Sequence, residues 1–288
     1  MFRDTVRKLV SANQKRAIKT RLNKIKKFYV NTFKSFTAKD LKSKLRELGI
    51  SRTDTLMVHA NFNPDSGFKG APIDVVNTFV DYLGDKGNFL MVSIPFRGPS
   101  YDYLKKNKPF KVNKTLSLMG LITEMFRRKK GTLRSLHPTH PVLAYGKDAE
   151  WLVADHEKCL YQCGAGSPFE KFREMKGKIL FYDVSFGAIT FYHYVEDIIK
   201  DKLPFEVYDK ELFKVKAFDK NNNECVIETY VYNPRIKRNA FKLEAEMIKR
   251  DLVKKSKIGN ASLILVNAED VVTVQTDMAA AGNPPYDL

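Results

Sequence analysis

RSLHPTHPVLAYG (Arg134–Gly146) opens the stretch of sequence that decides the fold, a segment that runs on to Glu196. It continues through GAGSP (Gly164–Pro168) and the apolar run KILFYDV (Lys178–Val184), and it closes on TFYHYVED (Thr190–Asp197). A turn, a strand and a His-bearing helix therefore follow one another within a segment the size of a βαβ unit. Open α/β sheets place their clefts at strand ends, so this order predicts polar side chains gathered at the end of a strand.

The flanking sequence completes an α/β pattern. TLMVHA (Thr55–Ala60) and NFLMVSIPF (Asn88–Phe96) read as buried strands, and IDVVNTFVDYL (Ile73–Leu83) between them has helical periodicity. Farther on, ELFKVKAFD and NECVIETYVYN flank an Asn-rich turn, which is typical of an antiparallel hairpin. We therefore expect one α/β domain over residues 37–288, with a mainly parallel central sheet, helices on both faces and an antiparallel hairpin.

Two helices of this domain have readable ends. Thr37 is a good N-cap residue and Asp40 follows three residues later, so a helix is expected from Thr37 to about Leu48. An amphipathic pattern predicts a second helix from Leu116 to Arg128.

The charge of the chain favours anionic partners. It contains 50 Lys and Arg against 33 Asp and Glu, a net charge of +17. Eleven basic residues precede position 35 and only Asp4 opposes them, so this segment carries 11 − 1 = +10. Such an excess suits nucleic acid, an anionic membrane surface or phosphorylated small molecules.

Residues 1–36 read as a basic amphipathic helical extension. Its apolar residues recur at three- and four-residue steps and comprise Phe2, Val6, Leu9, Val10, Ile18, Leu22, Ile25 and Tyr29. A helix of this kind can lie in a membrane interface and attract anionic lipid. The alternative is a helix packed on the domain or on a second subunit of a homo-oligomer, with a solvated basic face.

Several classes of protein find no support in the sequence. No apolar run approaches the roughly 18 residues of a membrane span, and the charged N-terminus does not resemble a secretory signal. Three cysteines make no disulfide framework and no metal site is indicated, so a reducing cytoplasm is expected. P-loop, dinucleotide and nucleophile-elbow motifs do not occur. No zinc-finger or RNP-type motif occurs either, so nucleic acid is not expected as a partner.

The ordered motifs carry a resemblance. RSxHPxxxxxAxG, GxGSPxxK and TxxHxxE, preceded by TLMVHA and LMGLITEMFRRKKGTLRS, are similar to the aminoglycoside 3-N-acetyltransferase family from about residue 37 to the C-terminus. The resemblance implies acetyl-CoA or another acyl-CoA as donor and an amino group on a sugar as acceptor. The N-terminal extension lies outside it.

The resemblance also implies which residues bind CoA. Arg134, Ser135, His137 and Pro138 would line the CoA cleft, together with the strand end His59-Ala60. The chain departs from the family where Ala60-Asn61 replaces two serines, and Pro141 replaces another serine. On the residues alone, Arg134 could instead form an ion pair, and His59 and His137 could be structural.

A general base for acyl transfer is predicted at His193. A protonated amine cannot attack a thioester, and a histidine is well suited to take the proton near neutral pH. Thr190, His193 and Glu196 are three residues apart, so one helix can direct them to one side. With Thr190 as N-cap, the helix N-terminus would keep His193 neutral. The resemblance likewise implies His193 as base with a carboxylate orienting it.

The carboxylate partner and the acceptor contacts stay open in the sequence. Glu196, Glu269 or Asp270 could orient His193. Thr190 and Asp183 are the candidates for substrate contact, although Asp183 could simply cap a turn.

The basic balance leads us to expect an anionic acceptor, a nucleotide-linked amino sugar for surface polysaccharide. An aminoglycoside is the first alternative. A non-catalytic module at a membrane surface or on nucleic acid is the second. The expected location is the cytoplasm, with attachment to the inner face of the membrane through residues 1–34 as an open alternative.

Overall fold

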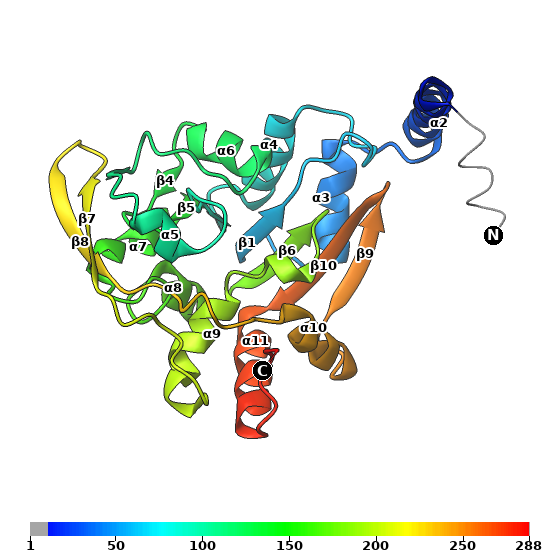
Figure 1. Ribbon diagram of the computed structural model, residues 1–288. Helices are drawn as coiled ribbons and strands as arrows, with labels where there is room; N and C mark the ends of the chain where they lie inside the picture. The colour runs from blue at the N-terminus through cyan, green and yellow to red at the C-terminus, as the bar shows by residue number, and fades with distance from the viewer. Residues whose placement is uncertain (1–10, 288) are drawn as a thin grey trace.

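The computed structural model describes residues 11–287 (Figure 1). The apolar positions predicted at Phe2, Val6, Leu9 and Val10 lie outside these residues. Within residues 11–287, no helix is both long enough and apolar enough to cross a membrane.

A seven-stranded sheet forms the centre of the molecule, in the order β4-β5-β2-β1-β6-β10-β9. Its strands are β1 (Thr55–Ala60), β2 (Asn88–Val92), β4 (Leu133–Arg134), β5 (Val142–Gly146), β6 (Lys178–Tyr182), β9 (Lys254–Ile258) and β10 (Ala261–Asn267). The two pairings of β1, with β2 and with β6, are parallel. The other four are antiparallel. The expectation of a mainly parallel sheet is therefore wrong, because β5 and β10 reverse direction on either side of a parallel centre.

Helices cover both faces of this sheet, as expected (Figure 1). One apolar cluster joins the sheet to α3, α4 and α6, and a second joins its other face to α7, α8, α9, α10 and α11. Every residue of β1 and β2 is buried, as is usual for parallel strands enclosed on both faces. The helices are α3 (Ala38–Glu47), α4 (Pro72–Leu83), α6 (Leu121–Arg128), α7 (Ala149–Val153), α8 (Pro168–Glu174), α9 (Tyr192–Ile199), α10 (Ala240–Lys249) and α11 (Ala268–Ala280).

A smaller sheet contains the predicted hairpin. β7 (Phe213–Phe218) and β8 (Glu224–Thr229) pair antiparallel around the Asn-rich turn. The short β3 (Phe110–Lys111) adds to β7 in parallel. The remaining short elements are α5 (Ser100–Leu104) and the 3-10 turns η1 (His156–Lys158), η2 (Phe186–Ala188) and η3 (Lys200–Lys202).

The structure confirms the predicted start of one helix and corrects the predicted start of the other. Thr37 and Asp40 form a reciprocal capping box at the start of α3, which confirms that boundary. By contrast, α6 begins at Leu121 and not at Leu116, because Gly120 has a φ of 112° that no α-helix accommodates.

The basic extension forms a 22-residue helix, α2 (Ala12–Phe33), that lies apart from the two helical layers (Figure 1). Ser11 and Gln14 cap it. Near its C-terminal end Val30 is buried. Phe36 already belongs to the body of the protein, where it packs on Phe68 with ring centroids 5.4 Å apart.

Candidate active site

His193 and Glu196 form a close pair on α9. Because they are three residues apart, their side chains share one side of the helix, and His193 Nδ1 lies 2.5 Å from Glu196 Oε2. A carboxylate only accepts hydrogen bonds, so Nδ1 carries the proton and the lone pair of His193 is on Nε2. The imidazole is therefore held in the tautomer that a general base requires.

Glu196 is fixed by three partners. Its side chain has no exposed surface. Arg238 Nε donates to both carboxylate oxygens at 2.7 and 2.9 Å, and the Tyr286 hydroxyl donates to Oε1 at 2.9 Å. Burial raises the pKa of Glu196, but His193 and Arg238 outweigh burial and hold this pKa below its usual value. Glu196 is therefore ionised and rigid.

The alternative acids serve elsewhere. Glu269 forms a two-pronged ion pair with Arg173 at 2.8 and 2.9 Å, and Asp270 accepts from Asn267 at 2.7 Å. The structure thus selects Glu196 as the carboxylate that orients His193.

Burial also sets the protonation of His193. Burial lowers the pKa of His193, Glu196 acts in the opposite direction, and Arg238 offsets part of the effect of Glu196. The net pKa lies below the usual 6.5, so the imidazole is neutral at pH 7. The predicted N-cap is wrong, however, although His193 still lies in the first turn of α9. Phe191, not Thr190, is the N-cap residue of α9, and Thr190 contributes its carbonyl oxygen to the His193 N–H at 3.0 Å.

Aromatic rings hold the imidazole in place. Tyr232 stacks on His193 with centroids 4.3 Å apart, and His140 meets its edge at 5.9 Å. The Arg238 guanidinium lies over the other ring of this stack, 5.0 Å from the centroid of Tyr232. The imidazole of His193 is thus held by aromatic rings on one side and by the Glu196 carboxylate at Nδ1.

A cavity of about 610 Å³ opens beside His193. His140, Tyr232 and Arg238 line it together with Arg97 and Met119. Its volume falls in the range of small-molecule sites, roughly 300–1,000 Å³. The cavity is therefore large enough for a small molecule to reach His193.

The predicted CoA-binding turn is buried next to this cavity and does not line it. Arg134 donates to the carbonyl oxygens of Ser93, Val112 and Thr115 and stacks on Phe110. These contacts tie the turn to two other segments of the chain, the end of β2 and residues 110–115.

Hydrogen bonds and ring stacking with nearby residues fix the rest of this turn. Ser135 accepts from the Val142 N–H at 2.8 Å and bonds His156 Nδ1 at 2.8 Å, and His137 stacks on His156. Pro138 is buried as well. In the structure these residues shape the turn that carries His140, and their direct contact with CoA stays a prediction.

The other predicted site residues lie at strand and helix ends. His59 and Ala60 end β1 and are nearly buried, with His59 stacked on Phe181. Asp183 follows β6 with a φ of 54° and accepts weakly from the Ser262 N–H at 3.4 Å. Neither Asp183 nor Thr190 lines the cavity beside His193.

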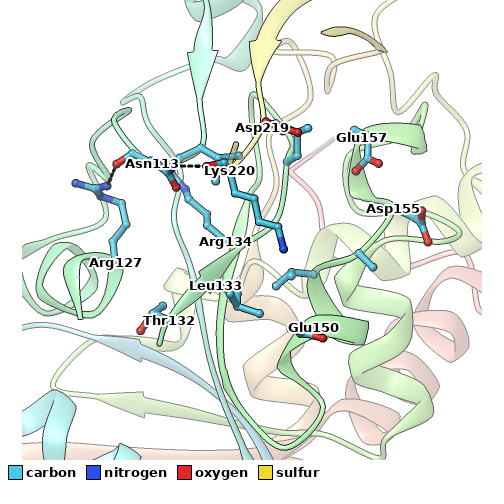
Figure 2. Close-up of a pocket in the computed structure, with 14 residues that line it drawn as sticks. Asn113, Arg127, Thr132, Leu133, Arg134, Glu150, Asp155, Glu157, Asp219 and Lys220 are labelled. Atoms are coloured by element: carbon cyan, nitrogen blue, oxygen red, sulfur yellow. Dashed lines mark hydrogen bonds between the residues drawn. The ribbon is translucent and has the colours of Figure 1, made fainter. Parts of the chain in front are cut away.

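A second cavity, of about 500 Å³, lies between α7, η1 and the hairpin turn (Figure 2). Acidic and basic side chains nearly balance across it, so charge alone selects neither cations nor anions. They are Glu150, Asp155, Glu157 and Asp219, against Arg127, Arg134 and Lys220. Within residues 11–287, no group of three or more His, Cys, Asp and Glu could hold a metal ion.

We expect an NMR titration of His193 to give a pKa below 6.5, because burial outweighs the single carboxylate beside the ring. The measurement follows ¹⁵N-histidine-labelled enzyme between pH 4 and 9, with the spectrum of His193→Gln used for assignment. An imidazole that titrates above 6.5 would show that Glu196 dominates.

The chain is similar to a known protein family and to characterised relatives. A family profile described as "Aminoglycoside 3-N-acetyltransferase" matches residues 57–280. Aminoglycoside N(3)-acetyltransferase III from Salmonella sp. is 26% identical over 258 residues, which cover 82% of this chain and 89% of that protein.

Solved structures share the fold. The aminoglycoside acetyltransferase AAC(3)-Xa aligns with a TM-score of 0.77 at 17% identity, over 92% of this chain and 99% of that one. AAC-IIIb in a binary complex with CoASH aligns with a TM-score of 0.71 at 21% identity, over 88% and 99% of the two chains.

Proposed function

Because the chain belongs to the aminoglycoside 3-N-acetyltransferase family, we propose that it transfers an acetyl group from acetyl-CoA to the amino group of an amino sugar. The observation that carries the proposal is the close contact of His193 Nδ1 with the buried carboxylate of Glu196, at the wall of a ligand-sized cavity. The predicted non-catalytic module does not account for this pair.

The proposed chemistry centres on His193. Its Nε2 takes a proton from the attacking amine as the nitrogen bonds to the thioester carbonyl carbon. The same proton then passes to the sulfur as the carbon–sulfur bond breaks, which leaves an amide and the free thiol. Acetyl-CoA supplies the activated acetyl group, and Glu196 stabilises the transient imidazolium.

The start of α6, close to the cavity, is a candidate site for the phosphates of CoA. Met119 lines the cavity, and α6 begins two residues later without a side-chain cap. Gly120 also packs close to the end of β1, since a Cβ placed on it would lie 3.9 Å from the Ala60 carbonyl oxygen. Free N–H groups at a helix start favour phosphate. We propose that the phosphates bind here, near His59-Ala60, with the pantetheine arm running toward His193.

The names of the relatives favour an aminoglycoside as acceptor over the predicted nucleotide-linked sugar. These names describe the relatives and not this chain. A shared fold at 17–21% identity does not indicate which substrate this chain uses. For this chain the proposal is therefore the wider class, an amine on a sugar.

The test mixes the protein with acetyl-CoA and a panel of amino sugars and follows the release of free thiol. Amine-dependent thiol release, with one acetyl group added to the sugar by mass spectrometry, is the expected result. Thiol release that does not depend on any amine would refute the proposal.

A further inference from the structure

The cavity beside His193 is positively charged and has no carboxylate of its own. Among the described residues that line it, none is Asp or Glu, whereas Arg97 and Arg238 both line it. Glu196 lies behind the wall, buried, with both oxygens bonded to Arg238 and to the other partners described above. No carboxylate is therefore free to bind an ammonium group in this cavity.

The two arginines differ in what they can bind. Arg238 is neutralised by Glu196. Arg97, in the loop after β2, is exposed and has no hydrogen bond or ion pair with any described residue. A free guanidinium binds a carboxylate or a phosphate through two parallel hydrogen bonds. Among the described residues that line the cavity, Arg97 is thus the cation that has no carboxylate partner and is available to an anion.

A polycationic acceptor fits this arrangement poorly. Each additional ammonium group would face Arg97 without a compensating acid, and like charges in a partly enclosed site repel more strongly than in water. An acceptor with one amine and one anion meets no such penalty. The positive cavity also favours the neutral form of the reacting amine, which is the nucleophilic form.

We propose that the acceptor is an amino sugar bearing a carboxylate or phosphate group near its reacting amine, and that Arg97 binds this anion. The inference rests on the proposed acetyl transfer and narrows its substrate class. The reaction is unchanged: the amine nitrogen gains the acetyl group and the sulfur gains the proton.

Steady-state kinetics with acetyl-CoA test the proposal. The acceptors are glucosamine without an anion, 2-amino-2-deoxyglucuronic acid, glucosamine 6-phosphate, UDP-glucosamine and the polycation sisomicin. We expect at least one anionic acceptor to exceed glucosamine in kcat/KM, and glucosamine to exceed sisomicin. The preferred anion shows whether the group is a carboxylate, a sugar phosphate or a nucleotide diphosphate.

The Arg97→Ala variant locates the contact. We expect it to raise KM for the anionic acceptor about 10–100-fold, as for the loss of a charged hydrogen-bonded pair, and to leave KM for acetyl-CoA within about twofold. Lys108→Ala removes an exposed charge outside the cavity and serves as the matched control, with both values unchanged.

Three outcomes would overturn the proposal. Sisomicin as the best acceptor would keep acetyl transfer and reject the anionic acceptor. An Arg97→Ala effect confined to KM for acetyl-CoA would place the arginine on the donor. No thiol release with any amine would reject acetyl transfer itself, and this inference with it.

A separate observation concerns α2, whose apolar face lies open. Ile18, Leu22, Ile25 and Tyr29 recur at steps of four, three and four residues and form one stripe, and each is at least half exposed. The positive charge of α2 argues against a dimer in which the α2 helices of two protein copies pack on each other. Residues 12–33 hold seven Lys and Arg and no acid, so two such helices side by side would repel.

We infer that α2 binds an anionic lipid surface. The apolar stripe would enter the acyl boundary, and the basic residues would meet anionic headgroups, which together distinguish a bilayer from nucleic acid. Attraction of this kind weakens as salt rises.

Sedimentation with vesicles of phosphatidylcholine and phosphatidylserine, 70:30, tests this inference on the full chain. We expect co-sedimentation at low salt, release at high salt and no binding to phosphatidylcholine alone. Leu22→Asp should reduce binding more than Thr20→Asp, which makes the same charge change two residues away, off the stripe. Equal effects, no binding, or a dimer that Leu22→Asp dissociates would each overturn it.

Discussion

Replacing His193 with Ala is expected to lower kcat for amine acetylation by about 10²–10⁴-fold, the usual contribution of a general base. The variant removes the Nε2 lone pair beside the cavity and leaves its other walls in place. The half-buried ring, with 22% of its side chain exposed, is a minor part of the core. We therefore expect acetyl-CoA binding, measured by calorimetry, to change little.

The His193→Asn variant separates a catalytic role of His193 from a role in stability. The Asn amide N–H can still donate to Glu196, but the side chain has no basic nitrogen. We expect the melting temperature to stay closer to wild type than in His193→Ala, while kcat falls as far. If His193→Asn keeps near wild-type turnover, His193 holds the structure and is not the base.

Local sequence signals predicted the pieces of the fold better than their directions. The strand β1, the helix α4 and the hairpin β7–β8 lie where apolar periodicity placed them. The strand β2 begins at the predicted Asn88 but ends at Val92, before the predicted Phe96. Nothing local distinguishes a strand that continues a parallel sheet from one that returns. The directions of β5 and β10 are fixed by partners across the sheet, and the expectation of a mainly parallel sheet failed for that reason.

The site shows the same limit. The i, i+3 spacing identifies His193 and Glu196, because one helix turn brings them together. Arg238 and Tyr286 join Glu196 from 42 and 90 residues away, and no motif marks either of them. The tyrosine at position 232 likewise stacks on His193 only because the loop after β8 returns to the cavity. Their roles depend on tertiary structure.

Glu196→Gln is expected to damage both stability and catalysis. The substitution keeps the size of the side chain but leaves Arg238, whose side chain is 18% exposed in the native protein, without its counter-ion. Breaking a buried pair on one side costs about 3–5 kcal/mol. For a domain of this size, that corresponds to a drop in melting temperature of roughly 6–20 °C, measurable by calorimetry.

In the proposed reaction Glu196 acts through His193, which makes Glu196 a positioning residue. Without the carboxylate, the imidazole loses the group that raises its pKa and fixes its tautomer. We expect kcat to fall about 10-fold or more, and the NMR-titrated pKa of His193 to move lower still. A variant that is merely less stable would keep that pKa.

The double variant Glu196→Gln/Arg238→Met separates the two effects. Removing the unpaired cation should restore most of the lost melting temperature, because replacing a whole buried ion pair is often nearly neutral. The double variant still lacks the negative charge beside His193 Nδ1 that fixes the tautomer of the imidazole, so kcat should stay low. Recovery of kcat together with stability would mean that Glu196 matters only as the counter-ion of Arg238.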